Sequence, residues 1–263
     1  MSLPFEIIIH RAHNFVAPEN SIEGILEIRQ LSKNLRIEVD ICVTSDDIPI
    51  LCHDMSLERL CGSQLLVSKI KYTDLPKRND NVAFVQLEEV INKFPEQSLL
   101  LDLRTSFLPE FFLGSETIPN EDPTLAIRLL SRIREIIPDG TEDRYRFIVT
   151  NLDHRPIVRD FFPTFEVDLG ELATRVNLSE LSTSSIIDIL GSENNRMYIR
   201  FRDIRPHIIQ WAQAHGISII ANHSPSRRSL KNSLMMFEKC YGWGLSGLVA
   251  SPVDEKIITK LKL

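Results

Sequence analysis

Eight short apolar runs alternate along the chain with stretches whose apolar residues repeat at helical spacing. This alternation is typical of parallel strands joined by crossover helices. The expected strands cover residues 5–9, 35–41, 98–103, 146–150, 165–169, 196–200, 217–221 and 246–250. Eight such units predict an α/β fold, a TIM (β/α)8 barrel, formed as a single domain by residues 1–263.

A ninth apolar run, at 48–52, follows the second expected strand after only Ser45-Asp46-Asp47. This link is too short for a crossover helix, so the run should return as an antiparallel hairpin partner. The barrel is therefore expected to carry a short hairpin or insertion at about 45–86, after its second strand.

The charge balance and the apolar pattern exclude several classes of protein. The 30 Lys and Arg residues against 36 Asp and Glu residues give a formal net charge of -6, which argues against a nucleic-acid partner. No apolar stretch approaches the roughly 20 residues of a transmembrane segment, and the opening MSLPFEIIIH lacks the features of a signal peptide. A cytoplasmic location is expected, whereas the oligomeric state stays open.

Three carboxylates fall at the ends of two adjacent expected strands. Glu38 and Asp40 point to one side of the second strand, and Asp102 interrupts an apolar run in the third. A barrel interior is normally apolar, and a buried carboxylate without a counter-charge is costly. A salt bridge would explain each acid alone. The three together favour one hard divalent cation, Mg²⁺ or Ca²⁺.

Two imidazoles and two guanidinium groups are expected beside these acids. His10-Arg11 ends the first strand, His53 ends the hairpin strand, and Arg104 follows Asp102 on the same face. His10 and His53 can divide proton donation and abstraction, while Arg11 and Arg104 hold an anion. With a divalent cation to withdraw charge, this set describes cleavage of a phosphodiester.

These residues, in this order, resemble the glycerophosphodiester phosphodiesterase family. The match begins with IIIHRAHNFVAPENS, which is similar to the family's His-Arg-Gly and Pro-Glu-Asn-Thr. It continues through IEVDICVTSDDIPILCHDMSLERLCG, which resembles Glu-x-Asp-Val, Thr-x-Asp, Pro-Val and His-Asp followed by Leu-x-Arg. LLLDLR stands where the family has Glu-x-Lys.

The resemblance implies a metal-dependent hydrolase that splits a small-molecule glycerophosphodiester into glycerol 3-phosphate and an alcohol, in lipid and glycerol metabolism. His10 and His53 would be the acid/base pair, and Arg11 and Arg104 would contact phosphate. Glu38, Asp40 and Asp102 would bind the metal. Glu19, in the Pro-Glu-Asn, would lie close to the metal or to Arg11.

Three departures from the family pattern are visible. Ala12 replaces the Gly after His-Arg, so if that position needs a positive φ, the loop should be shifted. Asp102 and Arg104 replace Glu and Lys with their signs kept, as in a compensated pair. The family's Trp-Thr-x-Asn is replaced by Ile220-Ala221-Asn222-His223, which loses an aromatic side chain.

Two alternatives remain open at this point. A sphingomyelinase D-like phospholipase shares the plan of two histidines and an acid cluster, but uses a substrate hydroxyl as nucleophile and forms a cyclic phosphate. A non-catalytic barrel could keep the phosphate site without turnover.

Overall fold

The computed structural model describes residues 5–13, 16–105, 124–149, 154–170, 196–222, 230–250 and 255–261. The strands are β1 (Glu6–Ile9), β2 (Arg36–Val43), β3 (Pro49–Leu51), β4 (Leu99–Leu103), β5 (Tyr145–Val149), β6 (Glu166–Leu169), β7 (Arg196–Arg200), β8 (Ser218–Asn222) and β9 (Gly247–Ala250). The α-helices are α1 (Ile22–Leu31), α2 (Glu58–Cys61), α3 (Leu87–Lys93), α4 (Leu125–Ile136), α5 (His154–Phe161), α7 (Pro206–Ala214), α8 (Leu230–Gly242) and α9 (Glu255–Leu261). Short 3₁₀ helices are η1 (His10–Ala12), η2 (Val67–Lys69), η3 (Tyr72–Asp74) and η6 (Phe201–Asp203).

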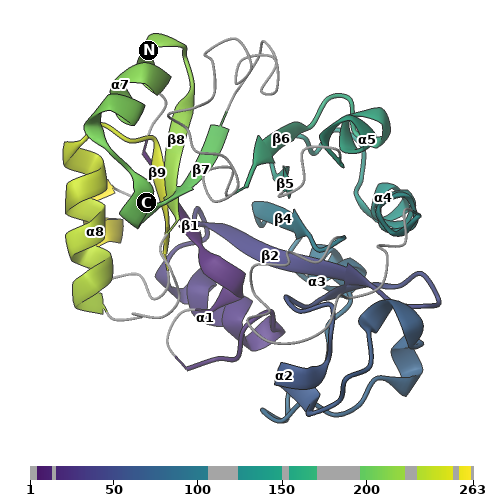
Figure 1. Cartoon of the computed structure of the whole chain (residues 1–263). Helices are drawn as coiled ribbons and strands as arrows, with labels where there is room; N and C mark the ends of the chain where they lie inside the picture. Colours follow the sequence, from purple (N-terminus) through teal and green to yellow (C-terminus); the bar gives the residue numbers. More distant parts are fainter. Residues whose placement is uncertain are drawn as a thin grey trace.

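Within the described ranges, eight parallel strands close into a barrel, with helices around it (Figure 1). Neighbouring strands follow the order β1-β9-β8-β7-β6-β5-β4-β2, and pairing of β1 with β2 closes the ring. β3 pairs antiparallel with the C-terminal half of β2, where Cys42 lies opposite Ile50. The predicted TIM barrel, with its hairpin after the second strand, is therefore confirmed.

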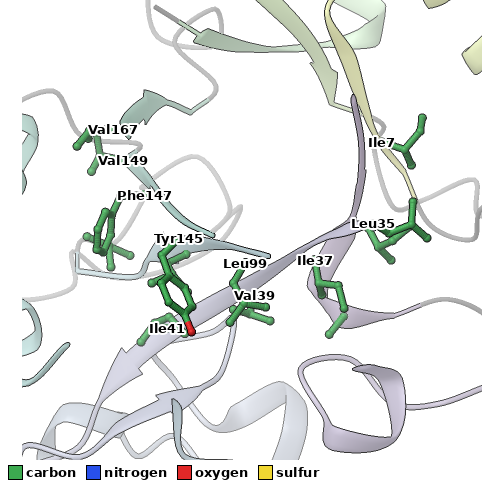
Figure 2. Close-up of a cluster of buried hydrophobic side chains, with 14 of the residues drawn as sticks. Ile7, Leu35, Ile37, Val39, Ile41, Leu99, Tyr145, Phe147, Val149 and Val167 are labelled. Carbon is green, nitrogen blue, oxygen red and sulfur yellow. The ribbon is translucent and has the colours of Figure 1, made fainter. Parts of the chain in front are cut away.

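The largest hydrophobic core lies between the barrel and its helices. Alternate strand residues such as Ile37, Val39, Ile41 and Phe147 are fully buried there, as Figure 2 shows for one part of the cluster. The residues between them face the barrel interior. In the middle of that interior, buried side chains form a second, smaller apolar cluster of Ile8, Leu100, Ile148, Tyr198, Ile220 and Val249.

Below this apolar layer, the N-terminal ends of the strands carry a cluster of ion pairs. The carboxylate of Glu6 lies 2.8 Å from Arg36 and 2.9 Å from Arg146. Arg146 also lies 2.8 Å from Glu166, which pairs with Arg196 as well. Opposite charges alternate around this end of the barrel, so each buried charge has a counter-charge.

Asp168 is the most buried acid of this ion-pair cluster at the N-terminal ends of the strands, with no exposed side-chain surface. Its carboxylate accepts a hydrogen bond of 3.0 Å from the hydroxyl of Tyr198. Burial raises the pKa of Asp168 to about 6, although Arg146 and Arg196 oppose the shift. The N-terminal end of the barrel therefore contains a carboxyl group that gains a proton more readily than an exposed aspartate does.

Helix α1 packs closely against the turn that follows β1. The side chain of Ser21 caps its N-terminus, because it accepts a 3.0 Å hydrogen bond from the amide of Gly24. A Cβ atom at Gly24 would lie only 1.9 Å from the carbonyl oxygen of Ala12, so this position requires glycine. On this helix Ile22 and Ile25 are buried, whereas Leu26 is 43% exposed.

Across the described ranges, every helix is too short or too polar to span a bilayer.

Candidate active site

The chain turns sharply after β1, and this turn carries the first two predicted site residues. His10 and Arg11 lie in η1, where Arg11 has a φ of 55° and Ala12 a φ of 46°. The backbone amide of Arg11 donates a 2.5 Å hydrogen bond to the carboxylate of Glu38. Alanine itself adopts the left-handed conformation at position 12, so a positive φ is present here without glycine. Such a residue stores about 1 kcal/mol of backbone strain.

The three predicted carboxylates meet inside the barrel, where β2 carries Glu38 and Asp40 and β4 carries Asp102. Asp40 lies directly opposite Asp102 in the strand register, and both side chains point into the barrel. Each of Glu38, Asp40 and Asp102 offers an oxygen atom within 4.8 Å of the others. Glu38 and Asp40 are almost completely buried.

The pKa values show two different environments within this cluster. Burial raises the pKa of Glu38, and the negative charges of Asp40 and Asp102 raise it further. Burial also acts to raise the pKa of Asp40, but positive charge at His53, Arg11, Arg104 and His10 outweighs it and holds that pKa well below its usual value. Both imidazoles therefore lie near the Asp40 carboxylate. Three crowded carboxylates are the donor set that a hard divalent cation requires.

Asn20 fixes Asp40 and was not among the predicted site residues. Its side-chain amide donates a 2.8 Å hydrogen bond to the Asp40 carboxylate, while its side-chain oxygen accepts from the Asp40 backbone amide at 3.1 Å. Asn20 has a φ of 53° and donates its own backbone amide to Arg11 at 2.7 Å. The Pro-Glu-Asn motif held a signal for this residue, because asparagine tolerates left-handed backbone better than most residues.

His53 follows β3 and is held by its neighbour. Its Nδ1 atom lies 2.6 Å from a carboxylate oxygen of Asp54. Burial raises the pKa of Asp54, but His53 and Arg59 lower it to about 2, so this carboxylate is ionised at neutral pH. An ionised acceptor keeps a proton on Nδ1 and directs Nε2 away from Asp54.

Arg104 connects the end of β4 to the His53 turn. Its Nε atom donates a 3.0 Å hydrogen bond to the backbone carbonyl of His53, and a terminal nitrogen lies 3.3 Å from Asp102. Its neighbours Asp102 and Asp40 raise its pKa despite burial, which keeps the guanidinium charged.

Glu19 was expected to lie close to the metal or to Arg11, and one of its carboxylate oxygens lies 3.3 Å from a terminal nitrogen of Arg11. Its other oxygen pairs with Arg59, the arginine of the Leu-x-Arg that follows His53-Asp54 in the sequence. Burial raises the pKa of Glu19, but Arg11 and Arg59 lower it below its usual value.

The structure therefore brings all eight predicted site residues to one end of the barrel. Two imidazoles, two guanidinium groups and three carboxylates can together bind a cation and an anionic phosphate, and can move protons between them. His223, the last residue of the segment that replaces the family's Trp-Thr-x-Asn, lies outside the described residues.

A family model matches the part of the chain that carries this site. The model of the Glycerophosphoryl diester phosphodiesterase family matches residues 10–123, which hold every predicted site residue. This match supports membership of that family. Over 94 residues the chain is 31% identical to Glycerophosphodiester phosphodiesterase 1 of Homo sapiens and 30% identical to that of Rattus norvegicus. These alignments cover 35% of this chain and 26% of each relative, so the chain spans about a quarter of the curated relatives it matches.

Solved structures show the same fold over the whole chain. A phosphodiesterase of Oleispira antarctica, solved in complex with the product sn-glycerol-3-phosphate, superposes with a TM-score of 0.72 at 17% identity, over 99% of this chain and 98% of that one. A Glycerophosphoryl diester phosphodiesterase from Parabacteroides distasonis gives a TM-score of 0.69 at 17% identity, over 99% of this chain and 87% of that one. At these identities the likeness establishes the barrel.

Proposed function

We propose that this chain is a divalent-metal-dependent phosphodiesterase that hydrolyses a glycerophosphodiester to glycerol 3-phosphate and an alcohol. The observation that carries the proposal is the meeting of Glu38, Asp40 and Asp102 beside two imidazoles, inside the segment that matches the family. The Oleispira antarctica structure, with sn-glycerol-3-phosphate as its product, supports the same substrate class.

The acid cluster fits a hard cation in its chemistry. Its ligands are carboxylate oxygens, and two of the three acids are almost fully buried. Burial, and then repulsion from Asp40 and Asp102, raises the pKa of Glu38. Glu38, Asp40 and Asp102 would hold the ion, with Asn20 fixing the orientation of Asp40. A bound Mg²⁺ or Ca²⁺ supplies Lewis-acid withdrawal of charge from a non-bridging phosphate oxygen.

The protein's own residues would carry the proton transfers. One imidazole of the pair His10 and His53 takes a proton from the attacking water, whose oxygen bonds to phosphorus. The other imidazole donates a proton to the alkoxide that leaves as the phosphorus–oxygen bond breaks. Arg11 and Arg104 hold the phosphate by charge-assisted hydrogen bonds and stabilise the charge that develops on it.

The test is release of glycerol 3-phosphate from glycerophosphocholine and glycerophosphoethanolamine, with Mg²⁺, Ca²⁺ or EDTA and with His10→Ala as control. We expect metal-dependent release that the variant lacks. A cyclic phosphate product would mean attack by a substrate hydroxyl, as in the sphingomyelinase D-like alternative. Cation binding with no turnover of any phosphodiester would instead support a non-catalytic barrel.

The single-domain assignment, the cytoplasmic location and the absence of a nucleic-acid partner stay predictions from the sequence.

A further inference from the structure

Arg59 joins two parts of the site that are far apart in the sequence. One end of its guanidinium, Nε, pairs with the Oδ2 atom of Asp54, and a terminal nitrogen pairs with the Oε1 atom of Glu19. Asp54 contacts His53 and Glu19 contacts Arg11 through their remaining oxygens. One side chain thus lies at the centre of an ion-pair chain that runs from the His53 turn to the turn after β1.

The two oxygens of Asp54 have separate partners. Oδ1 lies 2.6 Å from His53 Nδ1, and Oδ2 pairs with Arg59. A carboxylate is planar, so contacts on both oxygens fix its rotation about the bond to Cβ. Loss of the contact on Oδ2 would let the group turn, and the bond to His53 would lose its fixed direction.

The backbone that carries Arg59 is firmly placed. Leu57 and Leu60, on either side of it, are buried in a small apolar cluster with Cys42, Ile50 and Cys52 of the hairpin. α2 ends at Gly62, whose left-handed conformation allows its amide to bond back to Glu58. The Arg59 side chain itself is 48% exposed, so it adds little to this packing.

We infer that Arg59 is a positioning residue that acts through His53, by holding Asp54 in the orientation that fixes the imidazole. The inference rests on the proposed function, because it assigns His53 a role in turnover. An arginine suits this task because its planar fork can bind two carboxylates in fixed directions, which a lysine ammonium cannot do.

The experiment is a double-mutant cycle with Arg59→Ala and His53→Ala. Arg59→Ala should lower kcat about 10- to 100-fold, as expected when a reacting group loses its orientation, with KM changed less than about 3-fold. In the His53→Ala background the same substitution should lower the rate less than about 3-fold, because the group through which Arg59 acts is gone. If His53→Ala is below detection, Asp54→Asn provides the second arm of the cycle.

Three further measurements separate positioning from a general structural effect. Arg132→Ala removes an equally exposed arginine, 45% against 48%, from an ion pair with Glu135, and should leave kcat unchanged. Arg59→Lys should restore part of the lost rate. Millimolar guanidinium ion should partly rescue Arg59→Ala but not His53→Ala, which a merely destabilised fold would not show.

The outcomes are distinct. A wild-type kcat for Arg59→Ala, or a loss of the same factor in both backgrounds, would overturn the inference. A wild-type rate for His53→Ala would overturn the acid/base assignment in the proposed function. A loss in His53→Ala with no loss in Arg59→Ala would leave that assignment standing and remove only the role of Arg59.

Discussion

Substitution of Gly24 by alanine tests whether the turn that carries His10 and Arg11 is held by close packing against α1. A Cβ atom at this position would lie 1.9 Å from the carbonyl oxygen of Ala12 and 3.2 Å from that of Pro18. Real Cβ atoms essentially never come within 3.0 Å of such an atom, so backbone must move by about 1 Å. No side-chain rotation can relieve the contact, because both obstructing atoms belong to the main chain.

Two opposing effects decide how much Gly24→Ala changes the free energy of unfolding. Alanine has a higher helix propensity than glycine by about 1 kcal/mol. Overpacking against a fixed backbone costs about 1–3 kcal/mol and more when main chain must shift. We expect Gly24→Ala to lower the free energy of unfolding by about 2 kcal/mol. It should also lower kcat by up to about 100-fold, because η1 carries His10 and Arg11 and a displacement of about 1 Å can cost that much.

Gly242→Ala is the matched control, since Gly242 is also helical and a Cβ there meets no described atom within 4 Å. That variant should be neutral or slightly stabilised, with unchanged activity. Urea unfolding and glycerol 3-phosphate release measure the two effects. If Gly24→Ala unfolds at the same urea concentration as the wild type, the turn after β1 is not held by close packing against α1.

Three other predictions concern charges. Glu38→Ala should weaken Mg²⁺ or Ca²⁺ binding in calorimetry as well as lower the rate, and unchanged affinity would remove the acid cluster from the metal site. His10→Ala and His53→Ala should each reduce turnover by about 10²-fold or more with the fold intact by circular dichroism, and near-normal rates would refute the acid/base pair. Asp168 has a pKa of about 6 in the folded protein against 3.8 for an ordinary aspartate, so the folded state binds its proton more tightly. The contribution of Asp168 to the free energy of unfolding should therefore fall by at most about 3 kcal/mol as pH rises from about 4 through about 6. Asp168→Asn should remove this pH dependence of the free energy of unfolding, measured by urea titration. Wild type and variant whose free energies of unfolding change in parallel with pH would contradict the prediction.

The fold could be predicted from the sequence because its main signals are local. Each strand of the barrel is an apolar run of four to eight residues, and each observed strand falls within two residues of the predicted bounds. The hairpin was predictable from the length of a single link. The site residues could be predicted because parallel strands place their C-terminal ends on the same face of a barrel, which turns positions along the chain into neighbours.

The parts that could not be predicted depend on register and on side-chain direction. The ion pair between Glu6 and Arg146 joins residues 140 positions apart, and a single residue in a strand gives no sign of its partner around a closed barrel. Arg59 lies on a one-turn helix whose direction is set by the packing of its neighbours. The backbone of Ala12 shows the same limit, because the sequence shows which residue usually adopts a left-handed turn, but not what strain a particular turn accepts.

Arginines connect the turns at the C-terminal end of the barrel, and this explains how site residues outside the strands, such as His10 and His53, are held in place. Loops after parallel strands lack the ladder of backbone hydrogen bonds that holds the strands themselves. Here Arg11 connects the turn after β1 to Asp40, and Arg104 connects the end of β4 to the backbone of His53. The second contact also accounts for the departure from the family's lysine, because Arg104 reaches the His53 carbonyl with Nε and Asp102 with a terminal nitrogen at once. Asp102 is shorter than the family's glutamate and Arg104 is longer than its lysine, so the pair keeps both its charges and its total length. Substitutions of these arginines should therefore change the rate more than the stability, since they orient loops that contribute little to the buried core.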